Sequence, residues 1–185
     1  MVRETNMHNP PRLRELEDHI IKTEGGFVDD PLDVGGVTNY GITKPALADY
    51  LGVPVTNVTD QMIADLSEED ARTIYRVKWI THPRIRADLL HDHDVAMIVV
   101  DSAVLFGRER AAKWVQEICG VAQDGVIGTN TRAAMLLVDP RSIVFHIVRA
   151  RTVRHARVVR ANPTQVRFLE GWLTRALQFL SPDEA

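Results

Sequence analysis

Glu24 is the residue of this 185-residue sequence whose type and surroundings point most directly to chemistry. It continues a helical stripe of apolar residues that includes Leu16 and Ile20, and Gly25 and Gly26 follow it directly. An inward-facing acid should be partly desolvated, and the C-terminal end of a helix adds negative potential. Both effects disfavour the ionised form, so the sequence predicts a carboxylic acid that keeps its proton near neutral pH. Such an acid can donate that proton to the leaving oxygen of a glycosidic bond.

A second carboxylate is available in the glycine-rich loop that follows, which contains three aspartates, among them Asp30 and Asp33. We expect this loop to be wetter than the helix, so Asp30 or Asp33 should stay ionised and could orient water or stabilise charge on a sugar ring. Aspartate is also an ordinary loop residue that caps its own turns, so the spacing alone leaves both interpretations open. The pair Gly25 and Gly26 lacks side chains and would let a bulky polymer approach Glu24.

Polar and aromatic side chains, Thr38-Asn39-Tyr40, close the same loop. They could hydrogen-bond the N-acetyl groups of a sugar or hold the loop against Glu24, and the residue types do not decide between these roles. Tyr40 is the better candidate for stacking, because an aromatic face suits the apolar face of a sugar ring.

The sequence offers no convincing site for a metal or a cofactor. The run from His91 to Asp94 alternates His and Asp, but it lacks the i, i+4 spacing of a helical metal pair, so we expect Asp92 or Asp94 to cap a helix instead. No phosphate-binding glycine loop is present. The sequence therefore predicts neither a metal nor a cofactor.

Helical periodicity dominates the chain and predicts an all-α fold of about eight helices around one irregular Gly/Asp-rich loop or short hairpin at 27–42. Local signals set the helix ends: Gly25 and Gly52 as stops, Thr43 as a cap, a capping box from Ser67 to Asp70, and the helix-breaking pair Asp139-Pro140. The expected helices are 12–24, 43–52, 59–66, 67–79, 94–106, 109–119, 129–136 (capped by Thr129 or Asn130), 140–161, and a last one from Thr164. The three tryptophans, Trp79, Trp114 and Trp172, fall at core spacing.

Composition limits the class of protein. Apolar residues make up 45%, which is ordinary for a globular protein, and a single cysteine, Cys119, excludes an intrachain disulfide. The most apolar run, 95–106, which Asp101 interrupts, is too short to span a bilayer, which needs roughly 20 residues. The formal net charge of −3 gives no global field that would attract nucleic acid. No cleavable signal is visible among the first twenty residues.

Positive charge is concentrated in one helix. Residues 140–160 contain six arginines and no acid. Such a segment can be a solvated helix face, or it can touch an anionic lipid or wall polymer. The candidates for such contact are Arg149, Arg151, Arg154, Arg157 and Arg160.

The segment 24–43, EGGFVDDPLDVGGVTNYGIT, closely resembles the signature of glycoside hydrolase family 108, a family of lysozyme-like muramidases found among phage endolysins and secretion-activator proteins. The run 101–135, which begins DSAVLFG, resembles the second signature of the family and continues into a small peptidoglycan-binding segment. The family's catalytic acid falls on Glu24. The sequence departs from the family at Leu105, where an asparagine is usual.

The resemblance implies a lysozyme-like catalytic region at 12–107, a helical peptidoglycan-binding-like segment at 108–182 packed onto it, and a flexible arm at 1–11. It implies an N-acetylmuramidase that cleaves the β-1,4 bond between N-acetylmuramic acid and N-acetylglucosamine, with Glu24 as general acid. The alternatives are a lytic transglycosylase, which forms 1,6-anhydro ends, and a weakly catalytic wall-binding or secretion-assisting protein. We expect a monomer that is made in the bacterial cytoplasm and reaches the periplasmic wall after holin-type release.

Overall fold

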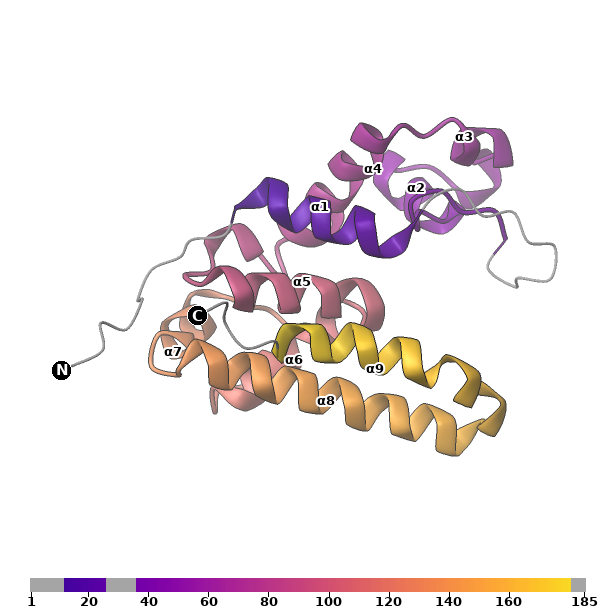
Figure 1. Ribbon diagram of the computed structural model, residues 1–185. Helices are drawn as coiled ribbons and strands as arrows, with labels where there is room; N and C mark the ends of the chain where they lie inside the picture. The colour runs from indigo at the N-terminus through magenta and orange to yellow at the C-terminus, as the bar shows by residue number, and fades with distance from the viewer. Residues whose placement is uncertain (1–11, 26–35, 181–185) are drawn as a thin grey trace. The chain divides into compact units, whose positions relative to one another are not determined.

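The computed structural model describes residues 12–25 and 36–180 (Figure 1). By contact the chain divides into two compact units, one from Arg12 to His82 and one from Pro83 onward. All the regular secondary structure of the described residues is helical, and one isolated bridge joins Asn39 and Ile42. The predicted all-α class is confirmed.

The first unit packs short helices around a small apolar core. Its elements are α1 (Leu13–Glu24), α2 (Lys44–Leu51), the 3-10 turn η1 (Val55–Asn57), α3 (Asp60–Ala64), α4 (Glu68–Tyr75) and the π-helical turn η2 (Arg76–Ile80). Completely buried residues of these elements and of the 36–43 segment fill the core: Leu16, Ile20, Ile42, Ile63, Ile74 and Ile80. α1 lies against α4 and η2, and α2 lies against η1 and α3.

Several helix ends of this unit follow the local sequence signals. Thr43 accepts a hydrogen bond from the Ala46 amide and begins α2, and Gly52 ends it in the left-handed conformation. Ser67 and Asp70 form the predicted capping box at the start of α4. The helix that was expected to continue to residue 79 instead widens after Tyr75 into a π-helical turn, in which the Thr81 amide donates to the Arg76 carbonyl at 2.8 Å.

The second unit is built around one apolar helix. Its elements are η3 (Ala87–Leu89), α5 (His93–Phe106), α6 (Arg108–Ile118), α7 (Thr129–Met135), α8 (Pro140–Ala161), η4 (Pro163–Phe168), α9 (Leu169–Leu177) and η5 (Gln178–Leu180). α5 contacts η3, α6 and α8, and α9 packs on α8. Asp92 caps α5 and Asp139 caps α8 through hydrogen bonds to backbone amides, so the capping role expected for the His-Asp run is confirmed.

Two helix starts in this unit were predicted wrongly. Gly128, rather than Thr129 or Asn130, occupies the N-cap of α7, and Thr129 is already helical. Residues 163–168 form a 3-10 segment, and α9 begins only at Leu169. Asn162 Oδ1 accepts hydrogen bonds from both the amide and the hydroxyl of Thr164, and this local arrangement replaces a normal first helical turn. None of the described helices combines the length and the apolar character that crossing a bilayer requires.

Candidate active site

Glu24 is the last residue of α1, and its side chain is half-buried. Gly25 ends the helix at a φ of 80°, and its amide donates to the Ile21 carbonyl at 3.3 Å. The acid therefore stands at the C-terminal end of a helix, as the sequence predicted, where the backbone carbonyls contribute negative potential.

Ion pairs hold α1 against α4 and against the π-helical turn η2. Glu17, whose side chain is 1% exposed, receives hydrogen bonds from Arg76 Nε at 2.6 Å and from Arg76 Nη2 at 3.1 Å. The bond to Glu17 raises the pKa of Arg76, so the guanidinium stays charged in this bidentate pair. Arg72 bonds both Asp18 and Glu68. These contacts set the position of α1 and hence of Glu24 at its end.

The loop opposite Glu24 contains a tight turn from Asn39 to Ile42. The two end residues exchange backbone hydrogen bonds, at 3.3 Å and 2.8 Å, and the two central residues have positive φ, 50° at Tyr40 and 72° at Gly41. Positive φ at both central positions is the geometry of a type I′ turn. A tyrosine in the left-handed region is strained by about 1–2 kcal/mol, so other contacts must hold Tyr40 there.

Tyr75 supplies one of these contacts. Its hydroxyl donates a 2.9 Å hydrogen bond to the Tyr40 carbonyl, and the residue is 1% exposed on α4. Its ring lies 5.0 Å from that of Trp79, centroid to centroid. The predicted packing role of Trp79 fits this contact, although Trp79 is only half-buried.

Asn39 supplies the other contact. Its side-chain amide nitrogen lies 3.2 Å from each of three carbonyl oxygens at the end of α3, those of Ile63, Ala64 and Leu66. The amide thus adds hydrogen bonds at a helix end, where the last carbonyls lack partners within the helix. Of the two roles that the sequence left open for Thr38-Asn39-Tyr40, this geometry shows loop-holding for Asn39, and contact with a sugar stays a prediction.

Gly41 brings the turn directly onto the acid. A Cβ atom at this position would lie 2.7 Å from Glu24 Cβ, 2.9 Å from Glu24 Oε2 and 2.8 Å from the Tyr75 hydroxyl. The Glu24 Oε2 atom and the Tyr75 hydroxyl oxygen therefore both lie beside the place that a side chain at position 41 would occupy. Only glycine leaves that place empty. The other candidates, Gly26, Asp30 and Asp33, lie outside the described residues.

Comparison with known proteins identifies the family. The Glycosyl hydrolase 108 model matches residues 17–107, and the Predicted Peptidoglycan domain model matches residues 110–177. A solved structure described as "Structure of Brucella abortus SagA" is 31% identical, covers 90% of each chain and gives a TM-score of 0.76. The chain belongs to the glycosyl hydrolase 108 family. No curated protein matches the sequence. Family membership and the second domain together make this chain a peptidoglycan hydrolase of the glycosidase class.

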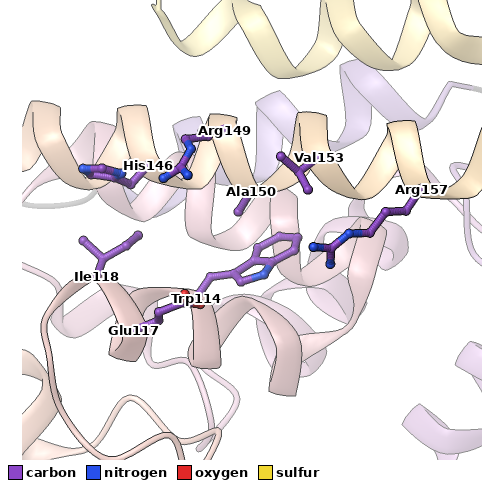
Figure 2. Close-up of a pocket in the computed structure, with 8 residues that line it drawn as sticks. All are labelled: Trp114, Glu117, Ile118, His146, Arg149, Ala150, Val153 and Arg157. Carbon is purple, nitrogen blue, oxygen red and sulfur yellow. The ribbon is translucent and has the colours of Figure 1, made fainter.

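The peptidoglycan-domain region of this family 108 hydrolase contains a groove between α6 and α8, with a volume of about 500 Å³ (Figure 2). Trp114 of α6 and Arg149 and Arg157 of α8 line it. Trp114 is half-buried rather than a core residue, so the predicted core role is only partly right. The sequence showed the arginines but gave no sign that Trp114 lies beside them.

One of the arginines predicted to contact an anionic partner does not reach the surface. Arg151 has a side-chain exposure of 0%, and its Nη2 lies 2.7 Å from Asp101 Oδ2, also at 0%. Arg175 of α9 donates to the same carboxylate at 2.8 Å. A guanidinium group buried as deeply as that of Arg151 needs an opposite charge, and Asp101 of α5 supplies it. The surface role proposed for Arg151 is therefore wrong, while Arg149, Arg157 and Arg160 are exposed and Arg154 is partly exposed.

Sequence reasoning missed Gly41 and Tyr75 as parts of the site. Gly41 stands inside the family signature, between Tyr40 and Ile42, and glycine is the residue that a two-residue type I′ turn favours at its second central position. Tyr75 carries no local signal, because its role depends on the packing of α4 beside the loop. Leu105, the departure from the family pattern, lies in the last turn of α5 with 37% of its surface exposed, so it does not fill the core.

Proposed function

We propose that this family 108 hydrolase is an N-acetylmuramidase in which Glu24 is the general acid. Its substrate is the β-1,4 bond between N-acetylmuramic acid and N-acetylglucosamine. The observation that carries the proposal is the close approach of Gly41 to Glu24, in a turn whose backbone is strained at Tyr40 and which has no side chain at Gly41. Strained backbone is found more often at active sites and ligand-binding sites than elsewhere in proteins.

The proposed reaction uses one proton from this chain. Glu24 gives its proton to the glycosidic oxygen as the bond from that oxygen to the sugar C1 breaks, and water adds to C1. Asp30 or Asp33 is the candidate that takes the proton of the attacking water. If it instead only stabilises the positive charge on the ring, the water gives its proton to the Glu24 carboxylate that the first step left behind. Tyr75 and Asn39 act as positioning residues, because they hold the turn that faces Glu24.

The test is digestion of purified peptidoglycan by the wild type, by Glu24→Gln and by Glu170→Gln. Glu170 is an exposed glutamate on α9 and gives a control with the same chemical change. Loss of a general acid typically costs about 10²–10⁴-fold in rate. We expect Glu24→Gln to lose activity to this extent with an unchanged far-ultraviolet spectrum, while Glu170→Gln keeps the activity of the wild type. Equal activity of Glu24→Gln and the wild type would exclude Glu24 as the acid.

Mass spectrometry of the same digests fixes the bond and the reaction. Products with N-acetylmuramic acid at the reducing end support the proposal. Products with 1,6-anhydro ends would instead identify a lytic transglycosylase, in which the muramic 6-hydroxyl replaces water. If the wild type released no fragments, the result would favour the alternative of a wall-binding protein with little catalytic activity. An endolysin role, with release to the wall through a holin-type pore, belongs to this proposal and is tested by co-expression with and without a holin.

A further inference from the structure

The groove between α6 and α8 is formed by one face of each helix. On α8, His146, Arg149, Ala150, Val153 and Arg157 follow one another at helical spacing, and on α6 Trp114, Glu117 and Ile118 do the same. Figure 2 shows the Trp114 indole extending from α6 toward α8, and the Arg157 side chain reaching toward it. The volume of about 500 Å³ falls in the range of sites that hold small molecules or peptides.

The groove carries positive charge that the described part of the chain does not neutralise. Of its eight lining residues, two are arginines and one, Glu117, is an acid. Within residues 12–25 and 36–180, no carboxylate forms an ion pair with Arg149 or Arg157. Arg151, on the opposite side of α8, is paired with Asp101. The two exposed guanidinium groups therefore remain available to an anion from outside.

Trp114 gives the groove an apolar surface with a fixed orientation. Its ring lies 5.1 Å from that of Phe106, in an edge-to-face arrangement. Phe106 in turn contacts the ring of His155, at 5.3 Å. The indole is thus supported from behind, while the residue remains only half-buried. A held aromatic face beside two arginines suits a ligand that has both an apolar part and carboxylates.

The distance between the arginines indicates the length of that ligand. Arg149 and Arg157 are eight residues apart on a continuous helix, which corresponds to about 12 Å along the axis. An extended peptide advances about 3.3–3.6 Å per residue, so three to four residues span this distance. The uncharged sugars of a glycan strand offer no negative group that could pair with two guanidinium groups. A groove between two helices also fits an extended chain better than it fits a flat bilayer surface.

We propose that this groove binds the short, carboxylate-bearing stem peptide of peptidoglycan, with Arg149 and Arg157 each pairing with a peptide carboxylate and Trp114 packing against the peptide between them. The proposal rests on the function proposed above only in taking peptidoglycan as the polymer. It gives the second domain a defined ligand, the peptide, while the site at Glu24 acts on the glycan.

The test is titration of the full-length protein with free stem tetrapeptide, monitored by calorimetry. The peptide contains no glycosidic bond, so the result does not depend on whether Glu24 cleaves anything. The variants are Arg149→Gln/Arg157→Gln and, as a control with the same loss of charge on α8, Arg154→Gln/Arg160→Gln. Neither Arg154 nor Arg160 lines the groove. A tetrapeptide with amidated carboxylates, a chitotetraose without peptide, and phosphatidylglycerol vesicles complete the set of probes.

We expect the wild type to bind the peptide with a Kd below about 1 mM, and the groove variant to bind at least about tenfold more weakly, because each charge-assisted pair contributes on that scale. The control variant should stay within about twofold of the wild type, since its arginines lie outside the groove. Amidation should weaken binding as the groove variant does. All variants should melt close to the wild type, since the substituted side chains lie at the surface.

Several results would overturn the proposal. The first is no binding of the free peptide by the wild type, and the second is equal binding by the groove variant and the control. Equal affinity for chitotetraose would assign the groove to the glycan, and binding of vesicles alone would assign it to a lipid surface. A Trp114→Phe variant provides an independent check, because it keeps a ring against Phe106 but removes the indole, and we expect it to weaken peptide binding without lowering the melting temperature.

Discussion

Gly41 offers the sharpest test of the site, because a single methyl group placed there meets the proposed acid directly. In Gly41→Ala the new Cβ would lie 2.7 Å from Glu24 Cβ, 2.9 Å from Glu24 Oε2 and 2.8 Å from the Tyr75 hydroxyl. The carboxyl oxygen can rotate away, but Glu24 Cβ is fixed to α1 and the Tyr75 hydroxyl ends a rigid, buried ring. The backbone of α1 or of the turn must therefore shift.

The size of the effect follows from two contributions. A non-glycine residue at a φ of 72° costs about 1–2 kcal/mol, and the overlap adds about 1–3 kcal/mol, as overpacking of a filled site does. We expect Gly41→Ala to lose about 2–5 kcal/mol of unfolding free energy and to remain folded. Displacing a catalytic group by about 1 Å can cost about 100-fold in rate, so activity should fall on that scale.

Gly52→Ala is the matched control. Gly52 has nearly the same φ, 70°, and a Cβ there would meet nothing within 4 Å. It therefore carries the backbone strain without the contact, and we expect a loss of about 1–2 kcal/mol with almost full activity. The assays are urea unfolding and clearing of permeabilised cells. If Gly41→Ala matched Gly52→Ala in both, the contact between the turn and Glu24 would have no functional meaning.

Two further predictions concern the supports of each unit. Asn39→Ala should lower the unfolding free energy by about 1–3 kcal/mol in urea unfolding, because the carbonyls of Ile63, Ala64 and Leu66 lose the hydrogen bonds from the Asn39 amide. Asn57 is exposed, so Asn57→Ala should change the unfolding free energy by less than about 0.5 kcal/mol; similar losses in the two variants would contradict a role of Asn39 in holding the turn. Burial, together with the nearby charges of Arg151 and Arg154, lowers the pKa of His155 below its ordinary 6.5. As the pH falls, His155 therefore takes up a proton in the unfolded chain at a higher pH than in the folded protein. The unfolding free energy should therefore be full above about pH 6.5 and decline below it, and His155→Phe, which keeps a ring beside Trp172, should reduce this decline; equal pH profiles would exclude His155 as a source.

Much of the fold could be predicted because helix ends depend on residues that are close together in the sequence. Thr43, the capping box at Ser67 and the pair Asp139-Pro140 act on amides within three or four residues, so the sequence alone specifies them. The 3-10 segment before α9 and the π-helical turn after α4 were missed. Both depend on how backbone hydrogen bonds shift by one residue, and apolar periodicity does not record such a shift.

The candidate site was predictable only where chemistry is local. The position of Glu24 at a helix end, before a glycine, follows from neighbouring residues. The contact with Gly41 and the hydrogen bond from Tyr75 join segments far apart in the sequence, so no spacing rule predicts them. The burial of Arg151 was missed for the same reason, although Asp101, the one charged residue of the apolar run 95–106, indicated that a cation should lie beside it.

The pair between Asp101 and Arg151 has a consequence for engineering. Asp101 lies within the segment that matches the hydrolase family, while Arg151 and Arg175 lie within the segment that matches the peptidoglycan domain. Cutting the chain between residues 107 and 110 would separate Asp101 from Arg151 and Arg175, so neither fragment would contain both charges of this buried pair. Chimeric enzymes that exchange one segment for a homologue must therefore transplant α5 together with the C-terminal helices, or replace the ions with apolar side chains of matching size.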